Sequence, residues 1–236
     1  MKFLHLILFL VIVVSSTFCQ KNSLTTFSDS LDLYKLDKYS GNFYLRIWTE
    51  RQIVDIWQRD SSDLFPGGYS VKLINWTSDY FSDNNDEFAR TYKMEDSYWS
   101  WQANKTKYLI DSIDIIKLIS SIDKNNLQSY VDPNTLIFEL KNSTGYNYYN
   151  LSNAKEQLNV SDAEKIVVFI DKLSELLNMK KYWEEFIEQI PVECYNNGGV
   201  ITTCKTLSKK EKRLLKKRRN KLPLTLSTFY RGVARN

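Results

Sequence analysis

Apolar and polar side chains alternate in several short stretches between residues 42 and 140, and a period of two is typical of β-strands. The clearest stretch is Asn42–Trp48, in which every odd-numbered position is apolar. Ile53–Trp57 is predicted to be its hairpin partner, although a single helix through both stretches also fits the pattern. The other predicted strands are Tyr69–Trp76, Ser97–Gln102, Leu136–Leu140 and, near the end of the chain, Leu224–Tyr230.

Turn residues separate several of these strands. The sequence Pro-Gly-Gly at 66–68 precedes the strand at Tyr69, and the turn Asn142–Gly145 follows the strand that ends at Leu140. The acidic segment Asp79–Asp96 shows no firm period, so no element is predicted within it.

Helical periodicity is strongest after residue 160. Ser161 and Glu164 have the spacing of a capping box, in which two side chains satisfy the first free backbone N–H groups of a helix. The pattern resumes at Trp183 and stops at Pro191, and a weaker pattern favours another helix over residues 108–122. The apolar positions on one face of the helix after Ser161 are Ile166, Phe169, Ile170, Leu173, Leu176 and Leu177.

The first nineteen residues have the three parts of a secretory signal peptide. Lys2 supplies a positive charge, Phe3–Val14 is apolar except for His5, and small polar residues follow. Cleavage is expected near Cys19. A membrane-spanning helix needs about 20 apolar residues, more than this run has, and the alternative is an uncleaved signal anchor. The leader predicts a protein that is extracellular or in the lumen of the secretory pathway.

Removal of this leader changes the chemistry that the mature chain can carry. His5 is the only histidine, so a Ser-His-Asp triad, a Cys-His pair and a histidine-bearing zinc site are all excluded once it is lost. Cys19 is expected to leave as well, and Cys194 and Cys204 remain. In an oxidising compartment these two are predicted to form a disulfide, and the alternative is a free reactive thiol.

Cleavage after residue 19 of 236 would leave about 217 residues, enough for one substantial domain. A composition of 43% hydrophobic and 14% aromatic residues is that of a folded chain. The predicted organisation is a signal peptide at 1–19, a single α+β domain at 20–204 and a basic tail at 205–236. The fold class is therefore α+β, with a strand-rich N-terminal half, a helical C-terminal half, a short disulfide loop and a basic C-terminal tail.

The net charge of +4 combines two regions of opposite sign. From Lys205 onward there are twelve basic residues and one acidic residue, Glu211, a net charge of +11. Removing Lys2 and this tail from the chain's 32 basic and 28 acidic residues leaves 19 against 27, a net charge of about −8. An acidic body and a basic tail have different partners, and the overall charge describes neither.

Within the tail, Ser208 and Glu211 repeat the capping-box spacing and predict a basic helix that ends before Pro223. Its cations would attract polyanions, which outside the cell are sulfated glycans or other anionic surfaces, and the leader argues against a nucleic-acid partner. The only apolar residues in the run are two leucines, too few for firm membrane insertion. The candidate polyanion-binding residues are Lys209, Lys210, Lys212, Arg213, Lys216, Lys217, Arg218 and Arg219.

Three alternatives to polyanion binding follow from the same residues. The tail could be a solvated segment, or it could lie on the acidic surface of the protein's own body. The four consecutive cations at 216–219 also resemble a dibasic cleavage site for proteases of the secretory pathway.

The sequence contains five Asn-X-Ser/Thr sequons, and together with the leader they predict N-glycosylation. A modified asparagine must lie at the protein surface. The weakest of the five acceptors is Asn159, because the hydroxyl of its sequon belongs to Ser161, the expected helix cap. The acceptor asparagines are Asn75, Asn104, Asn142, Asn150 and Asn159.

Two further patterns could indicate binding sites, one for sugars and one for calcium. In an extended Ser97–Gln102, Trp99 and Trp101 would share one face and could stack on sugar rings, although tryptophan more often belongs to a core. Alternating oxygen ligands at 83, 85 and 87 suggest calcium, but the glycine of a calcium loop is missing, so neither a metal nor a cofactor is expected.

No catalytic residue is predicted. A glycosidase needs a pair of carboxylates at a set separation. Neither Asp79–Asp96 nor the acids Glu184, Glu185 and Glu188 identify such a pair. The sequence therefore favours a secreted, N-glycosylated, non-enzymatic binding protein that could bind polyanionic glycans through its basic tail. The alternative is a secreted hydrolase, similar to a glycosidase, that uses a carboxylate pair.

Overall fold

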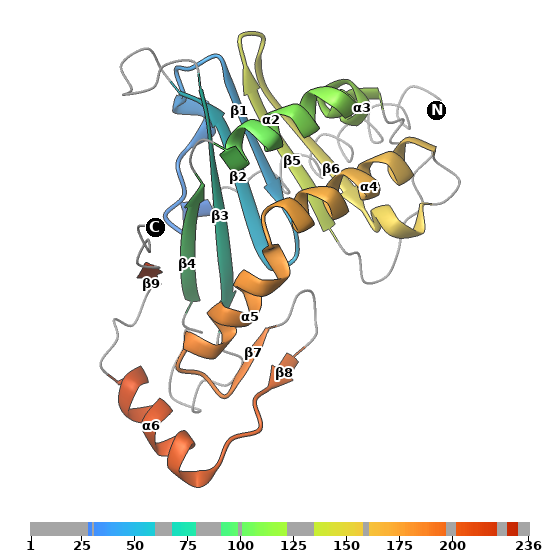
Figure 1. Cartoon of the computed structure of the whole chain (residues 1–236). Coiled ribbons are helices and arrows are strands. Elements are labelled where there is room, and N and C mark those ends of the chain that lie inside the picture. The colour runs from blue at the N-terminus through green and yellow to red at the C-terminus, as the bar shows by residue number, and fades with distance from the viewer. Residues whose placement is uncertain are drawn as a thin grey trace, which may run out of the picture. The chain divides into compact units, whose positions relative to one another are not determined.

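The computed structural model describes residues 28–29, 31–59, 68–78, 91–98, 101–121, 135–157, 161–196, 202–220 and 226–230 (Figure 1). The chain divides into two compact units, residues 1–35 and 36–236. In the first unit the predicted leader lies outside the described residues, and the amide of Leu33 donates to the carbonyl oxygen of Ser28 at 3.1 Å. The second unit contains every labelled helix and strand.

A seven-stranded sheet organises the second unit, with the strand order β6-β5-β1-β2-β3-β4-β9. Neighbouring strands are antiparallel except β4 and β9, which are parallel. The sheet therefore includes one strand from the region predicted as the basic tail. The strands are β1 Phe43–Trp48, β2 Gln52–Gln58, β3 Tyr69–Ser78, β4 Thr91–Tyr98, β5 Thr135–Asn142, β6 Gly145–Ser152 and β9 Leu226–Tyr230.

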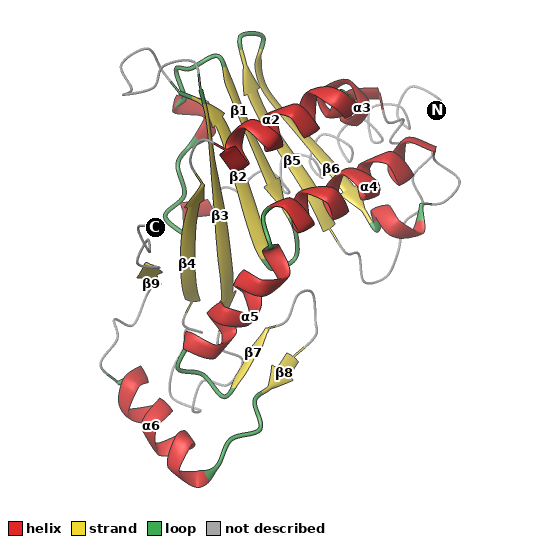
Figure 2. Cartoon of the chain, viewed as in Figure 1, coloured by secondary structure: helices red, strands yellow, loops and turns green. Residues whose placement is uncertain are grey.

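Helices cover one face of this sheet (Figure 2). Asp114 and Asn178 have left-handed backbones, with φ of 48° and 51°, which separate α2 from α3 and α4 from α5. Asp and Asn adopt this conformation more readily than most residues. The helices are α2 Trp101–Ile113, α3 Ile115–Ser121, α4 Ser161–Leu176 and α5 Met179–Gln189, with short 3₁₀ turns η1 Leu36–Lys38 and η3 Ala154–Glu156.

The main core lies between the sheet and these helices. Leu45 and Ile47 are fully buried there, as the alternating pattern of their strand predicts. Phe138 of β5 and the α4 residues Phe169 and Leu173 belong to the same cluster. Complete burial of a side chain of this size stabilises the fold by about 1.5–3 kcal/mol, so the pairing of α4 with the sheet is a large part of the driving force.

The opposite face of the sheet carries a row of charged side chains across five strands. Cross-strand register aligns Glu139 of β5 with Arg46 of β1, and Arg46 with Asp55 of β2. Asp55 in turn lies opposite Lys72 of β3, whose Nζ is 3.0 Å from a carboxylate oxygen of Glu95 on β4. Charges of alternating sign are thus neighbours along the row, an arrangement that stabilises adjacent strands.

The predicted α+β fold is confirmed, with its sheet in the N-terminal half and helices in the C-terminal half. Strands β4 and β6 were not predicted. In β4 the apolar residues Tyr92, Met94 and Tyr98 are interrupted by the buried Asp96, and on the other face Lys93 is 3% exposed beside Glu95. A charged side chain that is buried beside its partner conceals the period of the strand.

The prediction of an extended Ser97–Gln102 is wrong. β4 ends at Tyr98, and Trp101 is the first residue of α2. The reason is that Ala103, Thr106 and Ile110 follow helical spacing and are all buried. The helix predicted over residues 108–122 is present, but it begins earlier and is broken at Asp114.

A small second sheet precedes the C-terminal helix. Strand β7 Cys194–Asn196 pairs with β8 Thr202–Cys204, and Cys194 lies directly opposite Cys204. The two cysteines form the predicted disulfide, with 4.0 Å between their Cα atoms. A second apolar cluster, which includes Tyr195 of β7, Trp183 of α5 and Met94 of β4, fixes this hairpin to the main sheet.

Candidate functional site

The basic segment forms the helix α6 Lys209–Arg219, as its capping pattern predicts. The backbone amide of Glu211 donates to Oγ of Ser208 at 3.3 Å, and the amide of Ser208 donates to Oε2 of Glu211 at 2.7 Å. The hydroxyl of Ser208 also donates to Oε2 of Glu211 at 2.6 Å, and this bond together with the one from the Ser208 amide lowers the pKa of the Glu211 carboxyl. The only acid within the helix therefore serves as its cap.

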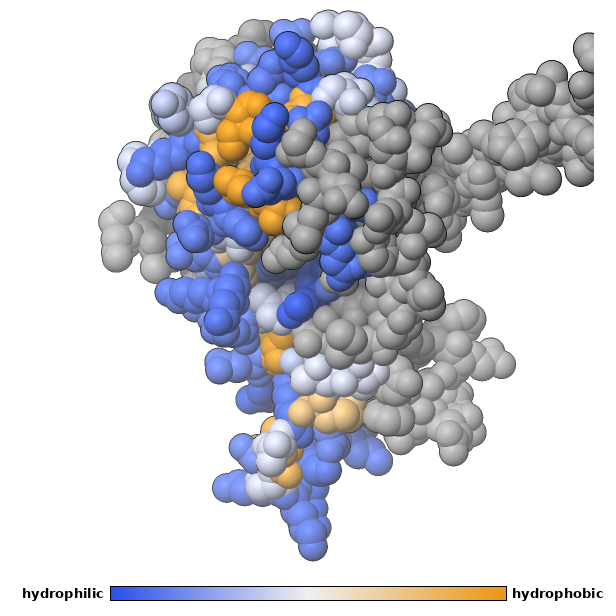
Figure 3. Space-filling model, turned by 90° about the vertical axis from the view of Figure 1, so that its right-hand side faces the viewer, coloured by the Kyte–Doolittle hydropathy of each residue, from blue (hydrophilic) through white to orange (hydrophobic). Residues whose placement is uncertain are grey.

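Six of the cations lie on one broad face of α6. At 100° per residue, they fall within an arc of about 160°, and Leu214, Glu211, Leu215 and Arg218 lie on the other side. Figure 3 shows this lower end of the structure as largely hydrophilic surface. The side chains of Arg219 and Lys221 are outside the described residues. The six cations of this basic face are Lys209, Lys210, Lys212, Arg213, Lys216 and Lys217, all of them exposed.

The basic face is mostly open to solvent. Among the described side chains of α6, only Lys212 forms an ion pair, with Glu193 just before β7. Leu214, on the opposite side of α6, is 50% exposed, so that side of the helix is not packed against a core either. In the part of the chain that the structure describes, α6 thus has a single ion pair with the body.

The base of α6 is held by a lysine beside the disulfide. Nζ of Lys205 donates to the carbonyl oxygen of Ile190, the residue that ends α5, at 2.8 Å. The backbone amide of Lys205 donates to the carbonyl oxygen of Glu193 at 2.8 Å. Burial lowers the pKa of Lys205 to about 8, and the charge of Glu188 partly opposes this effect. The two hydrogen bonds of Lys205 hold the chain against Ile190 and Glu193, and they fix the position from which the basic helix starts.

The tryptophan pair proposed for sugar stacking is not assembled on a strand. Trp101 lies at the start of α2 and is 59% exposed, whereas Trp99 is outside the described residues. Nζ of Lys105, one turn later, lies 3.7 Å from the centre of the Trp101 ring. This cation–π contact covers part of one ring face and leaves a single exposed indole.

One predicted glycosylation site is contradicted by the fold. Asn75 is fully buried on β3, and its Oδ1 accepts a hydrogen bond from Nε2 of Gln52 at 2.7 Å. The folded chain has no room for a glycan there. Asn104 is exposed on α2, Asn142 and Asn150 are half-buried on β5 and β6, and Asn159 lies outside the described residues.

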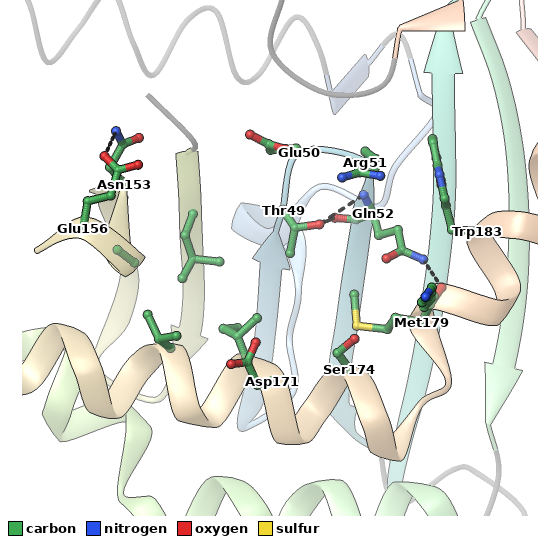
Figure 4. A pocket seen from close by; sticks show the side chains of 15 residues that line it. Thr49, Glu50, Arg51, Gln52, Asn153, Glu156, Asp171, Ser174, Met179 and Trp183 are labelled. Carbon is green, nitrogen blue, oxygen red and sulfur yellow. Dashed lines mark hydrogen bonds between the residues drawn. The ribbon is translucent and has the colours of Figure 1, made fainter. Parts of the chain in front are cut away.

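A cavity of about 640 Å³ opens beside the turn between β1 and β2 (Figure 4). The turn residues 49–51, the inward side of α4, the start of α5 and η3 surround it. Aliphatic side chains form much of its wall, including Leu136, Val167, Ile170 and Met179. A cavity of this size and mixed lining is typical of a site for a small ligand.

Gln52 places a fixed hydrogen-bond acceptor in this cavity. Its Nε2 donates to the carbonyl oxygen of Met179 at 2.8 Å and to Oδ1 of Asn75 at 2.7 Å. A backbone carbonyl can only accept, so these contacts determine which end of the amide is nitrogen. The oxygen, Oε1, accepts no hydrogen bond from a described residue, and Figure 4 shows it on the cavity side.

Three carboxylates border the cavity, and they bear on the hydrolase alternative. Glu156 and Asp171 are exposed, and Glu50 is half-buried. A glycosidase acid has to be placed in surroundings that favour its protonated form. Solvent contact at these carboxylates does not favour that role. The acids Glu184 and Glu188 on α5 are also exposed, and the candidate calcium ligands at 83, 85 and 87 lie outside the described residues.

Among the described residues, no group of three His, Cys, Asp or Glu side chains is arranged to hold a metal ion. No helix in the described ranges is both long enough and apolar enough to span a membrane. Comparison with known proteins gave no match to a family model, a curated protein or a solved structure.

The cavity was not predicted from the sequence. Gln52, Asn153 and Trp183 come from three distant parts of the chain, and no local spacing connects them. The basic helix, in contrast, lies within one continuous segment, so its cap and its charges could be recognised directly.

Proposed function

We propose that the mature chain is an exported glycoprotein that acts by binding sulfated glycans through the basic face of α6. The observation that carries the proposal is this face of six exposed cations, of which only Lys212 forms an ion pair among the described residues. The cations recur along about 12 Å of helix, a length that matches several consecutive charges of a linear polyanion.

The structure of the helix also supports this function. Glu211 is engaged in the cap, so it does not neutralise the basic face. The disulfide hairpin and Lys205 hold the base of the helix on α5. A fixed helix presents its cations without the conformational entropy that a disordered tail would lose on binding.

The test measures heparin binding by isothermal titration at several salt concentrations. Binding through counterion release makes the logarithm of affinity fall linearly with the logarithm of salt. The triple variant Lys209→Gln, Arg213→Gln, Lys216→Gln should bind at least tenfold more weakly at low salt. Its salt slope should be shallower by about three, one for each lost contact.

A matched control removes three exposed lysines elsewhere. Lys165→Gln, Lys172→Gln, Lys181→Gln on α4 and α5 lowers the net charge equally and should keep nearly all affinity. If the control loses as much as the α6 variant, binding depends on net charge alone. An α6 variant with unchanged affinity would contradict the proposal directly.

A further inference from the structure

The cavity beside the β1–β2 turn has two of its three carboxylates on the side away from Arg51. Figure 4 shows the carboxylates of Glu156 and Asp171 away from Arg51, which lies beside Trp183, and Glu50 on the same turn as Arg51. The guanidinium carbon of Arg51 is 5.6 Å from the centre of the Trp183 ring, so that ring helps to position it. The lining can therefore complement a ligand with a positive end and a negative end.

Two amide oxygens belong to residues that line this cavity, and one of them, Oδ1 of Asn153, is buried without a donor in the described chain. Gln52 is 8% exposed, and its Oε1 points into the cavity without a hydrogen bond from the described residues. Asn153 is 5% exposed, and its Oδ1 likewise has no partner in the described chain, while its Nδ2 donates to Glu156 at 2.8 Å. Buried acceptors without donors are costly, so a ligand that supplies N–H groups would recover this energy.

The remaining wall is aliphatic. Leu136, Val167, Ile170 and Met179 offer apolar surface between the two charged sides. A ligand that fills the cavity must therefore combine apolar side chains, N–H donors and terminal charges of opposite sign. A short peptide with free ends has all three, and a tripeptide spans only about 10 Å when extended.

We propose that this cavity binds short apolar peptides with free termini. The ammonium group lies toward Glu156 and Asp171, the carboxylate lies toward Arg51 and Lys180, and the peptide N–H groups donate to the amide oxygens. This site is separate from the basic face of α6, so it adds a second ligand class to the protein.

The test measures binding of the tripeptide Ala-Leu-Ala to the intact mature chain by isothermal titration. Two capped versions serve as probes, one acetylated at its N-terminus and one amidated at its C-terminus. Each cap removes one charge, and each should weaken binding to the unaltered protein at least tenfold.

Two double variants test which charged residues of the cavity contact each end of the peptide. Glu156→Gln with Asp171→Asn should lose its sensitivity to acetylation and keep its sensitivity to amidation. Arg51→Gln with Lys180→Gln should show the reverse pattern. Because Arg51 is half-buried, Lys180→Gln alone provides this arm if the double variant fails to fold.

Matched control substitutions are made at residues close in sequence to the altered positions. Glu175→Gln on α4 and Lys181→Gln on α5 change exposed charges that do not line the cavity, and both should behave like the unaltered protein. The proposal is overturned if Ala-Leu-Ala does not bind at millimolar concentration, or if neither cap changes its affinity. It also fails if the controls alter cap sensitivity as much as the cavity variants do.

Discussion

Arg46 and Asp55 form a two-point ion pair on neighbouring strands, with Nε 2.6 Å from Oδ1 and Nη2 2.9 Å from Oδ2. Both side chains are almost fully buried, at 1% and 5% exposure. The hydroxyl of Tyr44 donates to the same carboxylate at 2.9 Å. Every oxygen of Asp55 thus accepts from a fixed donor, which is the condition under which a buried charge is tolerated.

Asp55→Asn should destabilise the protein by about 3–5 kcal/mol, because it removes the two-point partner of the buried Arg46 charge and leaves it the more distant carboxylate of Glu139, 4.0 Å away. Urea unfolding followed by circular dichroism measures this loss. The control is Asp111→Asn, which removes the exposed partner of Lys107 and should cost no more than about 1 kcal/mol. Equal effects from the two substitutions would show that the pair makes no special contribution.

Removing the disulfide should cost roughly 2–3 kcal/mol, since the bond closes a short loop of 10 residues. The variant Cys194→Ser, Cys204→Ser tests this by urea unfolding. Adding a reductant to the unaltered protein should lower its stability by the same amount and leave the variant unchanged. A variant as stable as the parent would mean that the second apolar cluster alone holds the hairpin.

Stability should rise with pH from about 8 toward 10 because of Lys205. In the folded chain its pKa is about 8, whereas the ordinary lysine value is 10.5. Between these values the unfolded chain binds more protons, so increasing pH favours the folded state. Urea midpoints measured from pH 7 to 11 follow this change, and Lys205→Met should abolish the rise.

The same titration should turn downward above pH 10. Burial raises the pKa of Tyr44 and of Tyr146 well above the usual 10.0, and nearby carboxylates add to the shift. Unfolded tyrosines then lose protons that the folded ones keep, which favours unfolding. A stability curve that continues to rise through pH 11 would contradict this assignment.

Glycan mapping by mass spectrometry should find no glycan at Asn75 and should find one at Asn104 or Asn142. Asn75 is fully buried, whereas Asn104 is exposed on α2 and Asn142 borders the β5–β6 turn. Asn104→Gln with Asn142→Gln should then reduce the mass of the secreted protein. Occupancy at Asn75 would mean that β3 is not buried as described.

The sequence predicted elements well where local chemistry determines them. Ser208 and Glu211 define the start of α6 by their spacing alone, and the odd-numbered residues of β1 identify the face that packs against the helices. β4 was missed because Asp96 interrupts its apolar face and the ion-paired Lys93 and Glu95 lie within the same acidic stretch of sequence. The cavity was missed because Gln52 reaches Met179, 127 residues later, through a contact that only the folded chain creates.

The segment that contains α6 is the covalent link between strand β9 and the disulfide hairpin. Strand β9 pairs in parallel with β4, and the four consecutive cations at 216–219 lie between it and the disulfide hairpin. Cutting the chain at those cations would remove the covalent link between β9 and the disulfide hairpin, and β9 would then be a separate peptide paired with β4. Its departure would expose the edge of β4, which could then accept a strand from another molecule. Proteolysis at this one site would thus make β4, in place of β9, the strand at this edge of the sheet.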